Sequence, residues 1–233
     1  YICNGQTDHL IETGIDLYKL PLQEKKDILC SCIYGIDIDI HAVEVAKFSL
    51  LIKLIEDETA PSVSEVVPIL PDLGDNIQFG NSLVSQTELN GISGANRQMM
   101  EIAPFDWSTI NNGCGFDVII GNPPYVNTEG MHALLPSAEV EVYKKKYKTS
   151  HKQFDKYFIF IEQAINKINE NGLVCYIVPN KFFKIGAGEK LRNLIAKERM
   201  LVSLDDFGDA QLFEDKTIYS SIILLSKAKQ TSF

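Results

Sequence analysis

The stretch "FDVIIGNPPYVN", residues 116–127, determines how this sequence is interpreted. Its first half is a run of aliphatic residues typical of a buried strand. Pro123 and Pro124 follow, and because proline has no N–H to donate to a neighbouring strand, they end the strand abruptly. Asn122 and Tyr125 are therefore expected on a stiff turn at the carboxyl end of the strand. In open α/β sheets, this edge is where ligands bind.

Strands and helices are expected to alternate on both sides of this turn. Residues 30–39, "CSCIYGIDID", predict a buried strand, and residues 41–58 predict a helix with Asp39 as its N-cap. Residues 153–172 predict a helix that Gly172 stops. The remaining expected strands are 76–84, 173–183, 200–208 and 217–227, with a further helix at 188–198, a loop-rich segment at 85–115 and a polar insertion at 126–152.

This alternation predicts the α/β fold class. Strands separated by helices form βαβ units, which build a mostly parallel sheet covered on both faces. The last two strands have no helical pattern between them, so we expect them to form an antiparallel edge hairpin. The chain of 233 residues is long enough for one core and is interpreted as one domain, residues 1–233.

The composition is that of an ordinary globular protein. It is 45% hydrophobic and 23% charged, with a mean hydropathy of −0.02. No apolar run is long enough to span a membrane and nothing resembles a signal peptide, so we expect a cytoplasmic protein. The five cysteines are scattered without the spacing of a metal site, and we interpret them as buried thiols rather than metal ligands.

The charge alone does not identify a partner. A net charge of −9 argues against a surface that binds nucleic acid by itself. Residues 143–152, "YKKKYKTSHK", are an exception because they interleave basic and aromatic residues. Two interpretations remain open for this segment: a solvated loop or helix end, or a contact with backbone phosphates.

Two further strand ends carry polar residues. Asp37 ends "YGIDID", where an acidic residue commonly binds both hydroxyls of a ribose, and Ile38 beside it can form an apolar wall for a purine. Alternatively, Asp37 and Asp39 only cap the following helix. In "GNSL", Asn81 can offer its amide to the edge of an adenine, with Ser82 in support, although Gly-Asn is also a common turn.

The turn at Asn122 suits methyl transfer to an aromatic amine, whose lone pair is delocalised into the ring. The side-chain oxygen of Asn122 and the backbone oxygen of Pro123 can each accept one N–H bond from such an amine. This arrangement localises the lone pair on nitrogen and stabilises the positive charge that develops there. Tyr125 can stack on the base. The alternative is a strand-ending turn without chemistry.

At this point the sequence resembles a family. The segments "IYGIDIDIHAVEVAKFSLLIKLIE", "GNSL", "GFDVIIGNPPYV", "FDKYFIFIEQAI", "GLVCYIVPNKFF" and "FEDKTIYSSIILL" occur in the order found in S-adenosylmethionine-dependent adenine-N6 DNA methyltransferases. The chain resembles more narrowly the methylase region of type IIG enzymes, which fuse a restriction endonuclease to the methylase. The resemblance implies a Rossmann-like methyltransferase sheet, the cofactor S-adenosylmethionine, no metal for methyl transfer, and a bacterial or archaeal source.

The resemblance also implies roles for particular residues. Asp37 matches the ribose-binding acid, Ile38 the adenine-packing residue, and Asn81, supported by Ser82, the adenine-edge contact of the cofactor. The catalytic turn is matched by Asn122, Pro123 and Tyr125, and Phe213 matches the aromatic residue that holds the flipped adenine on the side opposite Tyr125. The implied partner is duplex DNA with one adenine flipped out of the helix.

One part of the family pattern is not matched. The family has a first strand and a glycine-rich loop that holds the methionine half of the cofactor, and residues 1–29 contain no such motif. We therefore expect a partial catalytic domain of a larger protein, without its target-recognition domain. This chain by itself is expected to bind cofactor weakly or not at all and to be inactive. We also expect either a rearranged sheet or self-association through unpaired sheet edges.

Other functions remain open from the sequence. The same turn occurs in methyltransferases that act on RNA bases or on protein glutamine. A non-catalytic, DNA-associated module with a methyltransferase fold is the third hypothesis. The DNA recognition sequence is not readable from these residues.

Overall fold

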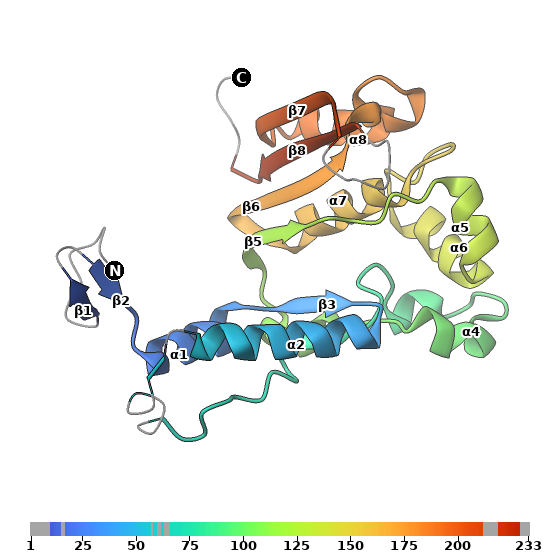
Figure 1. The fold of residues 1–233 in the computed structure, drawn as a ribbon. Coiled ribbons are helices and arrows are strands. Elements are labelled where there is room, and N and C mark those ends of the chain that lie inside the picture. The colour runs from blue at the N-terminus through green and yellow to red at the C-terminus, as the bar shows by residue number, and fades with distance from the viewer. Residues whose placement is uncertain are drawn as a thin grey trace. The chain divides into compact units, whose positions relative to one another are not determined.

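The structure is a computed structural model that describes residues 10–14, 17–56, 58–59, 62, 66–211 and 219–228. The chain folds into two compact units, Tyr1–Ser82 and Leu83–Phe233 (Figure 1). Each unit combines helices with strands and contains one parallel strand pair, as the alternating pattern predicts. The α/β class is therefore confirmed.

Within its described residues, the first unit contains helices α1 and α2 and two small sheets. Strands β1 and β2 are antiparallel, and β3 and β4 are parallel with Asp37 opposite Phe79. In chain order the elements are β1 (Ile11–Gly14), β2 (Leu17–Lys19), α1 (Leu22–Cys32), β3 (Gly35–Asp37), α2 (Ile40–Ile55) and β4 (Ile77–Phe79). They enclose a core of Leu22, Leu29, Val43, Leu54, Val66, Leu73 and Ile77.

The boundaries around β3 differ in part from the expectation. The N-cap of α2 is confirmed, because the side chain of Asp39 accepts a hydrogen bond from the backbone N–H of His41 at 2.8 Å. The strand expected over residues 30–39 is wrong in its first part, since α1 continues through Cys32. Leu29 of α1 is buried in the core of this unit, and such packing outweighs the strand preference of the local sequence.

The second unit is built on a four-stranded sheet with the order β5-β6-β8-β7 (Figure 1). Strands β5 and β6 are parallel, whereas β8 is antiparallel to both β6 and β7. The antiparallel pair expected from the last two strands is thus confirmed. Strand β8 lies between β6 and β7, and β7 is at the edge of the sheet. The bounds are β5 (Phe116–Gly121), β6 (Ile168–Pro179), β7 (Leu201–Gln211) and β8 (Tyr219–Ser226).

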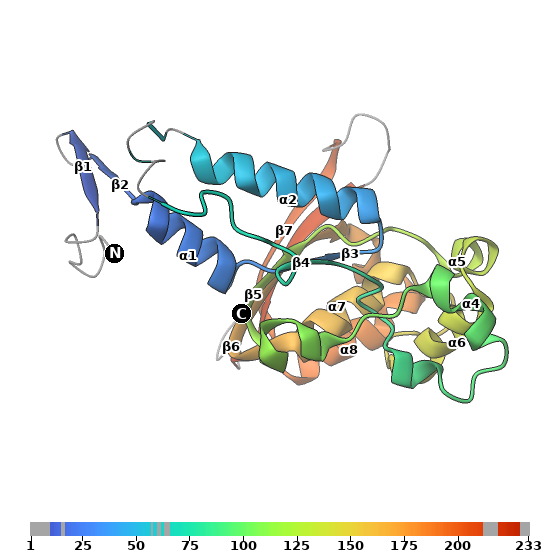
Figure 2. The ribbon, with the colours of Figure 1, turned by 90° about the horizontal axis from the view of Figure 1, so that it is seen from below.

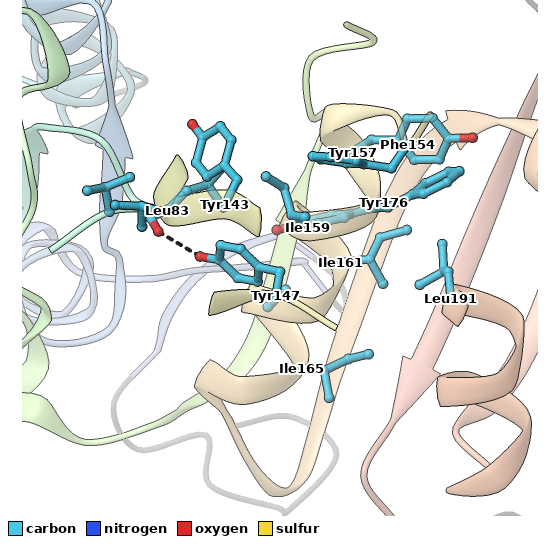
Figure 3. Packing of buried hydrophobic residues seen from close by; sticks show 14 of the residues in the cluster. Leu83, Tyr143, Tyr147, Phe154, Tyr157, Ile159, Ile161, Ile165, Tyr176 and Leu191 are labelled. Atoms are coloured by element: carbon cyan, nitrogen blue, oxygen red, sulfur yellow. Dashed lines mark hydrogen bonds between the residues drawn. The ribbon is translucent and has the colours of Figure 1, made fainter. Parts of the chain in front are cut away.

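Helices α7 (Lys156–Lys167) and α8 (Glu189–Lys197) lie on one side of this sheet (Figure 2). Ile161 and Leu191 of these helices pack with Val174 and Ile223 of the strands in one apolar cluster. Figure 3 shows part of this cluster, in which the Tyr147 hydroxyl donates a hydrogen bond to the backbone oxygen of Leu83 at 2.7 Å. The contact joins positions 64 residues apart.

The segments expected to be irregular contain helices. The range 85–115 holds α4 (Ala95–Ile102) and three short 3-10 turns, and the range 126–152 holds α5 (Thr128–Leu134) and α6 (Ser137–Lys146). These helices are short and rich in polar residues, and α6 has little amphipathic periodicity. They form because single apolar residues on them enter the core of the second unit, namely Ile102, Met131, Val140, Val142 and Tyr143.

The expected role of Gly172 as a helix stop is wrong. Helix α7 ends at Lys167, and Gly172 lies inside β6. A Cβ atom at this position would lie 2.8 Å from the backbone oxygen of Phe116. Glycine is therefore needed for the close approach of β5 to β6 rather than for ending a helix.

Both units contain a strand with an open edge. Within the described ranges, β5 pairs only with β6, and β3 pairs only with β4. On β5, the side chains of Val118 and Ile120 are 55% and 76% exposed. Among the described strands, the unpaired sheet edges expected for this chain are thus present.

Candidate active site

Strand β5 ends just before the diproline, as the sequence predicts. Strand β5 ends at Gly121, which lies opposite Tyr176 of β6, and the irregular segment that follows contains Asn122 and Pro123. A Cβ atom on Gly121 would approach the Tyr176 ring to 3.1 Å, so a small residue is needed where the strand ends. Pro123 is buried, whereas Asn122 is exposed and can reach a ligand.

Tyr125 is fixed by its hydroxyl group and by its ring. The hydroxyl lies 2.6 Å from Oδ1 of Asn122, to which it donates, and 3.1 Å from the backbone oxygen of Ile177. The half-buried ring makes an edge contact with Tyr157, with ring centroids 6.1 Å apart. Burial raises the pKa of the Tyr125 hydroxyl, so the group stays protonated at neutral pH.

A second segment, "FDKY" at residues 154–157, supports the chain that follows the turn. The backbone N–H of Lys156 donates to the oxygen of Val126 at 2.7 Å. The Thr128 hydroxyl donates to the oxygen of Phe154 at 2.8 Å. The sequence interpretation did not assign this supporting role, because the two segments are distant along the chain.

A cation lies at the carboxyl end of β6. Lys181 forms an ion pair with Asp155, with Nζ and Oδ2 3.0 Å apart. Asp155 is buried, whereas the Lys181 side chain is 48% exposed. The pair links the start of α7 to the residues after β6, and it leaves part of the Lys181 side chain accessible to solvent.

The first unit carries the residues predicted to bind the cofactor. Asp37, at the end of β3, is exposed, and its Oδ1 accepts the backbone N–H of Asp39 at 2.8 Å. The neighbouring Ile38 is 52% exposed, which leaves a surface for a ring to pack on. Asp39, rather than Asp37, is the residue that caps the helix.

The "GNSL" turn lies at the same sheet edge as Asp37. The backbone N–H of Gly80 donates to the oxygen of Asp37 at 2.8 Å, which brings the ends of β3 and β4 together. Asn81 is only 5% exposed and Ser82 is half-buried. Phe79 is opposite Asp37 in the parallel register and is 45% exposed, a neighbour that the sequence interpretation missed.

The predicted site residues are divided between the two units. Asp37, Ile38, Asn81 and Ser82 belong to the first unit, and the residues of the turn after β5 belong to the second. Phe213, predicted to hold the adenine opposite Tyr125, lies outside the described residues, and its role stays a prediction.

The basic segment 143–152 divides into core and surface residues. Tyr143 and Tyr147 are fully or almost fully buried, so these rings are not available to stack on bases. Lys145 pairs with Glu141 at 2.6 Å, and Lys146 pairs with Glu88 at 2.9 Å. The two tyrosines of this segment are therefore explained by their packing in the core rather than by a contact with nucleic acid.

The cysteines are less buried than expected. Cys32 and Cys114 are exposed, and Cys30 and Cys175 are half-buried, so the interpretation as buried thiols is wrong for the described cysteines. Across the described part of the chain, no three His, Cys, Asp or Glu side chains are grouped so that they could hold a metal ion. The described helices also include none that is both long and apolar enough to cross a membrane.

Comparison with solved structures identifies the fold. The DrdV–DNA complex superposes with a TM-score of 0.60 at 16% identity, over 90% of this chain and 22% of that chain. The M protein of the type I restriction enzyme EcoKI superposes with a TM-score of 0.51 at 14% identity, over 86% of this chain and 32% of that chain. These likenesses establish the fold, which is the α/β fold found in restriction-modification proteins.

Sequence comparison defines the family. The family model of the Eco57I restriction-modification methylases matches residues 31–213. RM.Eco57I of Escherichia coli, a type II restriction enzyme and methyltransferase, is 44% identical over 233 residues, which are 100% of this chain and 22% of that protein. M.PaeR7I of Pseudomonas aeruginosa, a type II methyltransferase, is 31% identical over 48% of this chain and 19% of that protein. The chain belongs to the Eco57I restriction-modification methylase family, and it spans about a fifth of the length of these relatives.

Proposed function

We propose that the protein transfers a methyl group from S-adenosylmethionine to the N6 amine of an adenine flipped out of duplex DNA, as part of a restriction-modification enzyme. The observation that carries this proposal is the exposed Asn122 side chain on the rigid turn after β5, held by the Tyr125 hydroxyl. The 44% identity with RM.Eco57I, named as both restriction enzyme and methyltransferase, supports it. Because that relative is named as both activities in one chain, it also supports the proposal that the complete polypeptide contains an endonuclease.

The chemistry follows from two oxygen acceptors at the turn. Oδ1 of Asn122 and the backbone oxygen of Pro123 each accept one N–H bond from the adenine amine. Positive charge develops on the amine nitrogen as it attacks, and acceptors that are already oriented stabilise that charge without reorganisation. The Tyr125 ring supports the flipped base by stacking, which contributes on the order of 1–3 kcal/mol per base.

The described residues fit the nucleoside half of the cofactor. One carboxylate oxygen of Asp37 accepts the N–H of Asp39, which leaves the other for ribose hydroxyls. The exposed Ile38 and Phe79 offer apolar surface for the adenine ring. When bound, S-adenosylmethionine supplies the methyl group as an electrophile. The protein's part is to bind the nucleoside and to orient the acceptor amine.

The test is methyl transfer from labelled S-adenosylmethionine by the complete gene product, with duplex DNA, RNA and protein as alternative acceptors. Label is expected in adenine N6 of DNA. Asn122→Ala should abolish the transfer, because the variant has no side-chain acceptor for the amine. Asn96→Ala is the matched control, because Asn96 is exposed on α4. Undiminished transfer by Asn122→Ala, or label only in RNA or protein, would refute the proposal.

A further inference from the structure

The Tyr125 hydroxyl has one proton and two acceptors within reach. Oδ1 of Asn122 is 2.6 Å away, and the backbone oxygen of Ile177 is 3.1 Å away. A phenol donates a single hydrogen bond. The shorter contact is therefore the hydrogen bond in this structure, and the Ile177 oxygen is an alternative acceptor for the same proton.

We propose that the Tyr125 hydroxyl positions the Asn122 side chain for methyl transfer, a role separate from base stacking by the ring. This inference rests on the proposed function. Asn122 is exposed, so packing does not restrict its side-chain rotation. Tyr125 restricts it instead, and it is a rigid donor because its ring packs against the core and makes an edge contact with Tyr157.

The Ile177 oxygen allows the hydroxyl group to release Asn122 without losing a hydrogen bond. When the substrate amine donates to Oδ1 of Asn122, a second donor on the same oxygen weakens its interaction with the developing positive charge. The Tyr125 proton can then turn to the Ile177 oxygen, 3.1 Å away. Only hydrogen bonds change in this step. The proton stays on Tyr125, whose pKa is raised by burial.

Tyr125→Phe tests this inference, because it removes the hydroxyl and keeps the ring. In the complete gene product, kcat for DNA methylation should fall roughly fivefold, the effect of one neutral hydrogen bond on the orientation of Asn122. The KM for DNA should change by less than about twofold, because stacking is retained. A 2-aminopurine at the target position should still become fluorescent when the base is flipped.

Tyr147→Phe is the matched control. The Tyr147 hydroxyl also has two acceptors, the Leu83 oxygen at 2.7 Å and Oε1 of Gln163 at 3.2 Å, and it is buried in the core of the second unit. Its loss should lower thermal stability and leave kcat within about twofold of the parent. An unchanged kcat in Tyr125→Phe, or a change in KM alone, overturns the positioning role. If Asn122→Ala retains activity, the proposed function itself fails.

Discussion

The carboxylate of Glu162 accepts a hydrogen bond from the backbone N–H of Thr149 at 2.8 Å. Its other oxygen accepts the N–H of Lys148 at 3.0 Å. Glu162 lies on α7 and is 6% exposed, so one buried carboxylate ties the chain after α6 to α7. Both oxygens are used: the hydrogen bond from Thr149 is buried and the one from Lys148 is partly buried, so each N–H group depends on the carboxylate as its acceptor.

Glu162→Gln should therefore destabilise the protein by about 1–3 kcal/mol. A glutamine amide has one oxygen, so it can accept only one of the two backbone N–H groups, and its own NH2 group would face the other. Urea unfolding measures the difference. Glu141→Gln is the control: this residue pairs with Lys145 on the exposed face of α6, and its loss should cost less than about 0.5 kcal/mol. Equal effects of the two substitutions would contradict the buried role of Glu162.

Glu58 should make the stability depend on pH in the acidic range. Burial alone would raise the pKa of this carboxyl, but hydrogen bonds from Lys25, Lys19 and Ser62 lower it to about 2 from 4.5. Because the folded pKa lies below the unfolded one, the stabilisation is fully present above pH 4.5 and is lost as the pH falls toward about 2.

The Glu58→Gln variant should accordingly be less stable than the parent at pH 7. The difference should shrink progressively below pH 4.5 and disappear near pH 2. Denaturant unfolding at a series of pH values measures this dependence. A difference that is constant from pH 7 to pH 2 would show that the Glu58 carboxylate does not provide the stabilisation.

Asp37→Asn should weaken S-adenosylmethionine binding by the complete gene product. The substitution keeps the size of the side chain and removes the charge that strengthens hydrogen bonds to the ribose hydroxyls, so Kd should rise roughly 10- to 100-fold. Calorimetric titration measures Kd. Asp75→Asn, at an exposed turn position in the same unit, should leave Kd unchanged. Unaltered binding by Asp37→Asn would remove Asp37 from the cofactor site.

The open edge of β5 should promote self-association of this chain. Val118 and Ile120 are exposed beside strand hydrogen-bonding groups that have no strand partner within the described residues. Ile120→Lys should shift the protein toward monomer at tens of micromolar, because a charge on the strand disfavours edge pairing. Sedimentation velocity measures the change. Met100→Lys is the control and should have no effect, because Met100 is 95% exposed on α4.

The sequence predicts best where the deciding interactions are local. The diproline after an aliphatic run identifies the end of β5, and Asp39 next to the start of α2 identifies a helix cap. Each feature depends on backbone geometry within a few residues, which is why inspection of the sequence identified them. The order of the motifs was also sufficient to indicate the family.

The tertiary structure decided the features that depend on distant contacts. Helix α6 forms in a segment without a clear local signal, because Tyr143 and its neighbours enter a core built from residues far along the chain. Gly172 is in a strand because the backbone of Phe116 approaches it closely. The hydrogen bond from Tyr125 to Asn122 depends on ring packing against Tyr157. Local propensity contributes a few tenths of a kcal/mol per residue, whereas burial contributes several times more, so packing prevails where the two disagree.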